Sequence, residues 1–169
     1  PKGVQSAAMA KYCPAVTVEC GQPHLPHGIT HATEFLDSLL HIHEIPDHPI
    51  HEQDINLFHT VARIKIPADS TFSFTDKNAD IYLQPDIENY NFAELDAGFV
   101  FGKCNGHQPV LPEAWNDSNE NKSADFFYLE QQTLRLRKPL MPAMITLNKD
   151  IIRQDCLCYL MERLPLPTK

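Results

Sequence analysis

Glu19 is the residue whose type and position most favour chemistry. It follows Ala15-Val16-Thr17-Val18, a short β-branched run between Pro14 and Gly21 that predicts a buried strand. In α/β sheets, ligands bind just beyond the carboxyl ends of the strands. A carboxylate held there, between an apolar strand and a tight loop, can have a raised pKa and move protons. The plainer interpretation is an acid at a strand end that pairs with a neighbouring cation or contacts water.

The nine histidines offer a second possible chemistry. His24, His27 and His31 lie in a predicted loop and the first turn of a predicted helix, and His27 and His31 could face one metal ion if both were helical. No carboxylate or cysteine completes a set nearby, and Pro26-His27-Gly28 predicts loop rather than helix. Solvated or hydrogen-bonded histidines are the simpler interpretation, and we predict no metal ligand within these 169 residues.

Composition excludes several classes of partner. The formal net charge is −8 and the sequence pI is near 5.5, which argues against nucleic acid. Arg135, Arg137 and Lys138 alternate with leucines, a pattern typical of the solvated face of a strand. No apolar run approaches the ~20 residues that span a bilayer, so no membrane partner is expected. Five irregularly spaced cysteines favour reduced thiols in the cytoplasm.

The elements that must position Glu19 are the predicted strand, a loop and one helix. The helix is predicted to start with Thr30 as its cap and to end before Pro46. Three- and four-residue spacing predicts that it buries one stripe, formed by Ala32, Phe35, Leu36, Leu39, Leu40 and His43.

The rest of the chain is rich in short β-like runs. Strands are predicted at 57–66, 71–74, 81–83, 98–101, 126–129, 133–136, 144–147 and 156–161. No second helix is predicted, and Asp117 to Ser123 is expected to form a long exposed loop. The predicted fold is therefore α+β. Residues 1–47 are a strand-loop-helix remnant of an α/β domain, and residues 48–169 form an all-β, barrel- or sandwich-like domain.

Three segments resemble the succinylglutamate desuccinylase/aspartoacylase family. The first is the proline, short apolar strand and Glu-x-Gly of residues 14–23, followed by Gly28 and the amphipathic helix. The others are Phe127-Tyr128-Leu129-Glu130 with residues 137–144, and residues 155–160. The resemblance implies a zinc-carboxypeptidase-like α/β domain followed by a β domain at the mouth of the active site.

The resemblance also implies roles for two residues. Zinc would be held by a His-x-x-Glu pair and a later His, all upstream of this chain. Glu19 matches the family's catalytic glutamate, which takes a proton from zinc-bound water and returns it to the departing amine. Tyr128 matches a tyrosine that contacts the substrate. The alternative for Tyr128 is a packed strand residue with its hydroxyl at the surface.

The expected function is zinc-dependent, cytoplasmic removal of an acyl group from a small N-acyl amino acid or related amide. The chain alone is expected to be inactive, because it lacks the zinc ligands. One alternative is a non-catalytic β module that binds a small molecule or a protein partner, and another is a carboxypeptidase acting on peptides. An uncovered helix stripe would promote association, so a homo-oligomer is also expected.

Overall fold

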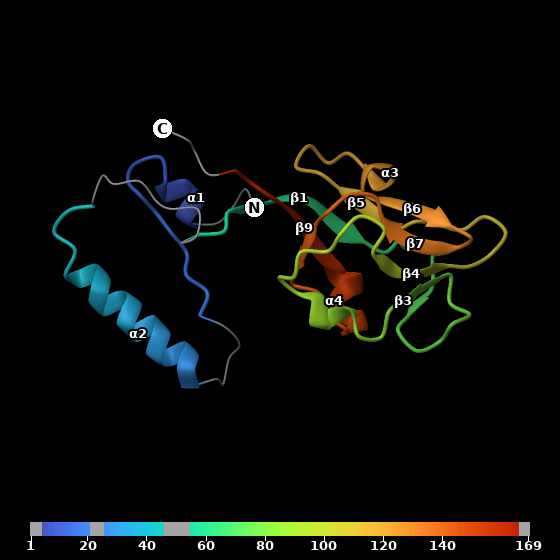
Figure 1. Cartoon of the computed structure of the whole chain (residues 1–169), viewed down its shortest axis with the longest axis horizontal. Helices are drawn as coiled ribbons and strands as arrows, with labels where there is room; N and C mark the ends of the chain where they lie inside the picture. Colours follow the sequence, from blue (N-terminus) through green and yellow to red (C-terminus); the bar gives the residue numbers. More distant parts are fainter. Residues whose placement is uncertain (1–4, 21–25, 46–54, 166–169) are drawn as a thin grey trace. The chain divides into compact units, whose positions relative to one another are not determined.

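Two β-sheets dominate the C-terminal part of the chain. The computed structural model describes residues 5–20, 26–45 and 55–165. The chain divides into two compact units, Pro1–Pro49 and Ile50–Lys169 (Figure 1). The protein is mixed α+β, with mostly sheet and few helices in the described residues. The predicted domain boundary after residue 47 lies outside the described residues.

The first sheet has four strands in the order β5-β1-β9-β8. Its strands are β1 (Phe58–Lys65), β5 (Glu113–Trp115), β8 (Met141–Ala143) and β9 (Cys158–Arg163), all antiparallel to their neighbours. Both outer strands are bonded on their far side by other parts of the chain. Leu140 exchanges backbone hydrogen bonds with Leu95 beside β8, and beside β5 the Ala114 carbonyl accepts from Lys122 N.

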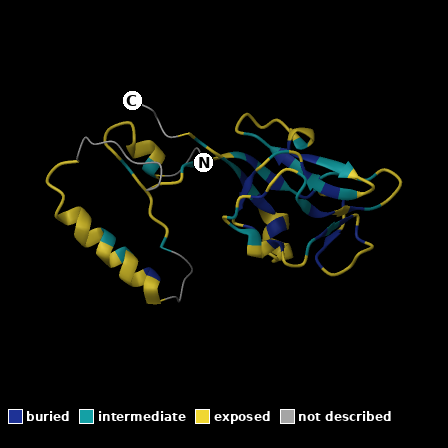
Figure 2. Ribbon diagram, viewed as in Figure 1, coloured by how far each residue is buried: buried dark blue, intermediate teal, exposed yellow. Residues whose placement is uncertain are grey.

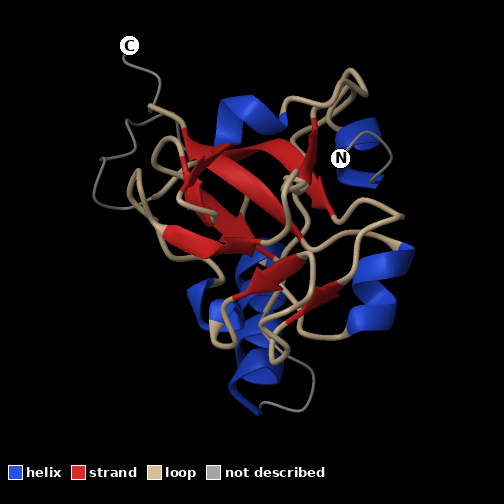
Figure 3. Cartoon of the chain, turned by 90° about the vertical axis from the view of Figure 1, so that its right-hand side faces the viewer, coloured by secondary structure: helices blue, strands red, loops and turns tan. Residues whose placement is uncertain are grey.

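The second sheet has five strands in the order β2-β3-β4-β7-β6. Figure 3 shows the strands of the protein in red and its helices in blue. They are β2 (Phe72–Ser73), β3 (Ile81–Leu83), β4 (Val100–Cys104), β7 (Thr133–Leu136) and β6 (Phe127–Glu130). Only β2 and β3 pair in parallel. The β6–β7 hairpin places Tyr128 opposite Arg135.

The two sheets share one hydrophobic core. Alternate residues of each strand point inward, as the two-residue period of a strand requires. Ile64 and Leu160 of the first sheet and Phe101, Leu134 and Leu136 of the second are fully buried in the same cluster. Figure 2 shows that buried segments gather in the strands of the second unit.

A short helix, α4 (Lys149–Gln154), ties the loop before β2 to the core. The Asn148 side chain caps it by accepting hydrogen bonds from two backbone amides in its first turn. Arg153 lies over the Phe72 ring at 4.8 Å and donates to the carbonyls of Pro67 and Ser70. The prediction of no second helix is wrong. Helix α4 is six residues long, too short for a helical spacing of apolar residues to be recognised in the sequence. Two other helical turns, η1 (Ile87–Tyr90) and α3 (Ser123–Phe126), are shorter still.

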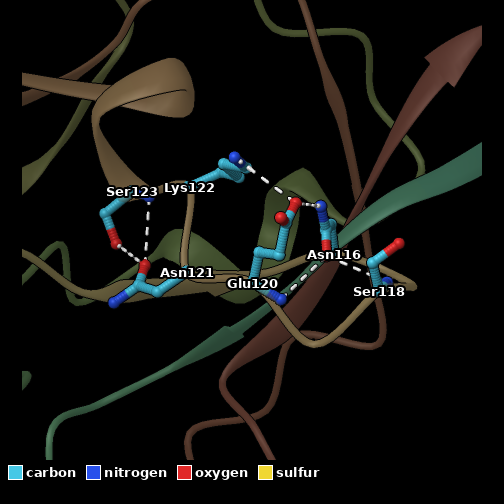
Figure 4. A network of polar contacts seen from close by, with 6 residues as sticks. All are labelled: Asn116, Ser118, Glu120, Asn121, Lys122 and Ser123. Carbon is cyan, nitrogen blue, oxygen red and sulfur yellow. Dashed lines mark hydrogen bonds and ion pairs between the residues drawn. The ribbon is translucent and has the colours of Figure 1, made fainter.

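The segment predicted as a long loop, 117–123, is a hydrogen-bonded network that leads into α3 (Figure 4). The Asn116 side-chain oxygen accepts from the backbone amides of Ser118 and Glu120, each at 2.9 Å. Its amide nitrogen donates to the Glu120 carboxylate, which also pairs with Lys122 at 3.3 Å. The hydrogen bond from Asn116 holds the pKa of Glu120 below its ordinary value. Local side-chain bonds of this kind order a polar segment that lacks a core.

The first unit contains α1 (Gln5–Met9) and α2 (Pro26–Leu40). Helix α2 begins four residues before the predicted cap, because proline suits the first helical position. Thr30 instead donates back to the Pro26 carbonyl, at 3.4 Å. In the described residues its apolar stripe is not buried: Ala32 and Phe35 are half-buried, and Leu36, Leu39 and Leu40 are exposed. Figure 2 shows α2 mostly in the colour of exposed residues. This exposure agrees with the uncovered stripe expected for a strand-loop-helix remnant of an α/β domain. His43 lies beyond the end of the helix.

The predicted strand at Ala15–Val18 is wrong. Residues 14–20 follow no regular secondary structure, and Val16 is 67% exposed. A strand exists only by pairing with another strand, and none of the described segments pairs with this one. β propensity alone therefore did not decide the structure of this run.

Seven of the eight predicted strands of the second unit are close to observed ones, and the eighth is misplaced. The strand predicted at 144–147 is instead β8, at Met141–Ala143. Strand β8 contains Pro142, and it is the outer strand of its sheet, where a residue without an N–H is tolerated. Met144 ends the strand because its φ is +59°. The short strand β5 was not predicted.

Candidate functional site

Glu19 lies in the extended stretch that leads from α1 to residue 20, and its side chain is exposed. Two contacts hold this stretch. Thr17 Oγ1 donates to Ser6 Oγ of α1 at 2.9 Å. The carbonyl oxygen of Cys20 lies so close to Gly28 that a Cβ on Gly28 would be 2.5 Å from it. The absence of a side chain at Gly28 allows this close approach in the first turn of α2, and Glu19 directly precedes Cys20.

The histidines do not form a metal site in the described residues. His27 and His31 are both helical, contrary to the expected loop at His27, and so lie one turn apart on α2 with exposed side chains. His41 Nδ1 is 2.7 Å from the Asp37 carbonyl. His24 lies outside the described residues. Within 5–20, 26–45 and 55–165, no three histidine, cysteine or acidic side chains meet to hold a metal ion, so these residues do not fit a zinc site.

Tyr128 is a half-buried residue of β6 with a cation on its ring. The Arg137 guanidinium lies over the ring, with Cζ 5.3 Å from the centroid. Gly98, at φ +85°, passes close to the Tyr128 hydroxyl, which would be 3.8 Å from a Cβ at that position. No hydrogen bond of this hydroxyl is formed with the described part of the protein. The ring of Tyr128 therefore has a cationic neighbour, whereas its hydroxyl has no hydrogen-bond partner among the described residues.

Arg135 and Arg137 flank Tyr128 but are held differently. Arg135 donates through Nη1 to the Gly98 carbonyl at 2.7 Å. Its Nε is 2.9 Å from a Glu130 carboxylate oxygen, close enough for an ion pair although the angle does not make a hydrogen bond. Arg137 donates through Nε to the Ala124 carbonyl at 2.8 Å. The predicted solvated strand face is only partly correct: β7 ends at Leu136, so Arg137 lies beyond the strand, and Arg135 is half-buried. The sequence gave no sign of the contact between Arg137 and Tyr128.

A groove of about 260 Å³ lies elsewhere in the second unit. Its apolar lining comes from Phe58, Pro139, Leu140, Met141 and Met161, and its charged lining from Glu94, Glu162 and Arg163. Two hydrogen bonds, of 3.0 and 2.6 Å, join Arg163 to Glu94 and hold the pKa of Glu94 below its ordinary value. Glu162 pairs with Lys138. The charges of this groove thus already have partners within the chain.

The buried cysteines are not candidate nucleophiles. Burial raises the pKa of Cys104 to about 12 and that of Cys156 to about 11, and it raises the pKa of Cys158 well above the ordinary value. These thiols therefore stay protonated near neutral pH. All five cysteines are free.

Comparisons with known proteins assign neither a family nor a function to this chain. No protein-family model, curated protein or solved structure matches this chain. In the described residues, no helix is both long and apolar enough to cross a membrane. The likeness to the succinylglutamate desuccinylase/aspartoacylase family therefore stays a prediction.

Proposed function

We propose that this chain is part of an enzyme that removes the acyl group from a small N-acyl amino acid, with Glu19 as its proton-transferring residue. The observation that carries the proposal is the contact between Cys20 and Gly28. It places Cys20, the residue after Glu19, against the first turn of α2, and the Glu19 side chain is exposed. Glu19 and Cys20 also belong to the Glu-x-Gly motif of the resemblance, which Gly28 follows.

In the proposed reaction, water adds to the acyl carbon and the amide C–N bond breaks. The Glu19 carboxylate accepts a proton from the water and delivers it to the amine nitrogen as that nitrogen leaves. Tyr128 is proposed to contact the substrate. The zinc implied by the resemblance would have to be held by residues other than the described ones, and we assign no step to it. The zinc-carboxypeptidase-like origin of the first unit and a cytoplasmic location, with which the five free thiols agree, belong to the same proposal.

The test is a deacylation assay of the complete encoded protein. Free amine is measured after incubation with a panel of N-acetyl and N-succinyl amino acids, with added zinc and with a chelator. Glu19→Gln should lower kcat by about 10²–10⁴-fold, since it removes the proton acceptor. Glu34→Gln, an exposed carboxylate on α2, is the matched control and should keep kcat within about twofold. Turnover that is unchanged in Glu19→Gln would rule out the assigned role.

A non-catalytic binding module is the second candidate. Its support is that the second unit has its own core and an apolar groove lined by Phe58, Met141 and Met161. On this alternative, no member of the substrate panel would be hydrolysed by the complete protein. A Phe58→Ala change would then weaken binding of an apolar ligand, measured by calorimetry, without any effect of Glu19→Gln.

A further inference from the structure

Arg137 differs from the other arginines of the protein in how its nitrogens are used. All five arginines lie in the described part of the second unit. Arg163 donates through all three of its nitrogens, and Arg153 through both terminal nitrogens. Arg135 uses Nη1 and places Nε against a carboxylate. In Arg137 only Nε is bonded within the described residues, so both terminal nitrogens are available.

The Arg137 guanidinium is nevertheless fixed in place. The Nε bond to the Ala124 carbonyl holds one side of the group, and its Cζ lies over the Tyr128 ring, 5.3 Å from the centroid. Its backbone N–H also donates to the Phe126 carbonyl, at 2.8 Å. An arginine ordered before binding loses less side-chain entropy when a ligand arrives. Among the described residues, by contrast, the side chain of Arg63 has only a 4.0 Å ion pair with Asp155.

The two available nitrogens are the ends of a planar fork, a geometry that matches the two oxygens of one carboxylate. The neighbouring charge of Arg135 is balanced by Glu130, so a single positive group is presented. A chain of net charge −8 repels polyanions, but one ordered guanidinium still suits a small ligand with one carboxylate. The Tyr128 ring adds an apolar surface beside it.

We propose that Arg137, held on the ring of Tyr128, is a carboxylate-binding residue, and that its ligand is the free carboxylate of an N-acyl amino acid. The choice of ligand rests on the proposed function, whereas the carboxylate-binding geometry does not. Because the site is exposed, the expected dissociation constant is on the order of 1–10 mM. Arg137 is thus a specificity residue for acids over the corresponding amides.

The test is an NMR titration of the complete protein with N-acetylglycine and, separately, with N-acetylglycinamide. The Arg137 Nε–H signal should move with the acid and stay in place with the amide. Arg137→Gln should weaken binding of the acid about tenfold, and Arg137→Lys about fivefold, because the charge stays but the fork is lost. Tyr128→Leu should weaken it, whereas Tyr128→Phe, which keeps the ring, should weaken it less. Arg63→Gln is the matched control and should bind normally.

The outcomes separate this inference from the proposed function. An Arg137 signal unmoved by acid, or equal affinity in Arg137→Gln and Arg63→Gln, overturns the inference even if Glu19→Gln abolishes deacylation. An Arg137 signal that moves only with the acid supports the site even if no N-acyl amino acid is hydrolysed. Circular dichroism of each variant must match the parent protein, so that a folding defect is not read as lost binding.

Discussion

The two units of this chain use their apolar residues in opposite ways. In the second unit, large side chains such as Phe101 and Leu134 are fully buried between two sheets. In the first, Gly28 is the only buried residue within 5–20 and 26–45, and Leu36 and Leu40 are 60% and 82% exposed. Helices in proteins draw most of their stability from packing of an apolar face. The second unit therefore contains the contacts that specify its fold. Helix α2 has the apolar spacing of a helix that packs on a core, but its apolar residues are mostly exposed in the described part of the chain.

The largest expected effect on stability comes from removing a large side chain from the core of the second unit. Phe101→Ala removes a buried ring whose centroid is 5.4 Å from that of Phe127, and should cost about 3–5 kcal/mol in the free energy of unfolding. Leu40→Ala, the matched change on α2, should cost less than about 0.5 kcal/mol. Denaturant unfolding followed by circular dichroism measures both. Similar losses for the two variants would contradict the contrast between the units.

A smaller effect is expected from two crowded glycines, one in each unit. A Cβ on Gly102 would overlap the Tyr82 carbonyl, and one on Gly28 would overlap the Cys20 carbonyl. Gly102→Ala should cost about 2–3 kcal/mol, because sheet hydrogen bonds hold Tyr82 in place. Gly28→Ala should cost under about 1 kcal/mol, because Cys20 belongs to no sheet and can shift.

Thermal unfolding of both glycine variants is the measurement. Gly106→Ala is the control for backbone strain alone, since its φ is +95° but no atom lies within 4 Å of the added Cβ. If Gly28→Ala proved as costly as Gly102→Ala, the first unit would be more rigid than its exposed residues indicate.

The smallest expected effect is a gain in the stability of the second unit that leaves the first unit unchanged. The β6–β7 turn is formed by Gln131 and Gln132, with φ of +48° and +67°. Left-handed backbone at both positions favours Asn-Gly, so Gln131→Asn with Gln132→Gly should add about 1 kcal/mol of stability. The denaturation midpoint should rise while hydrogen exchange of the α2 amides stays the same. Altered exchange in α2 would mean that the units are coupled.

Much of the second unit could be predicted from sequence because alternation is a local signal. Ile81–Leu83 and Thr133–Leu136 were predicted with the observed bounds, since their apolar residues alternate between turn-forming neighbours. The first unit could not be predicted in the same way. Ala15–Val18 has strand composition, but pairing is a property of two segments and the described residues supply only one.

From the sequence, single candidate residues could be chosen, but the contacts between them could not be predicted. Glu19 was singled out by its place at the end of a predicted strand, whereas Tyr128 was singled out only by the family resemblance. Predicting that Arg137 lies over Tyr128 would have required the register of the β6–β7 hairpin. That register was hidden because Gln131-Gln132 lacks the glycine or asparagine that usually marks a two-residue turn. The close approach of Cys20 to Gly28 likewise depends on how the chain turns back on itself.

The bonding on the far side of β5 and β8 has a consequence for behaviour at high concentration. An exposed strand edge offers unpaired amides and carbonyls on which another copy can polymerise. Here Leu95 and Phe92 bond to Leu140 and Pro142 at one margin, and Lys122 and Asn121 bond to Ala114 at the other. Both margins of the four-stranded sheet are thus capped by the chain itself. Self-association by extension of this sheet into fibrils is therefore disfavoured.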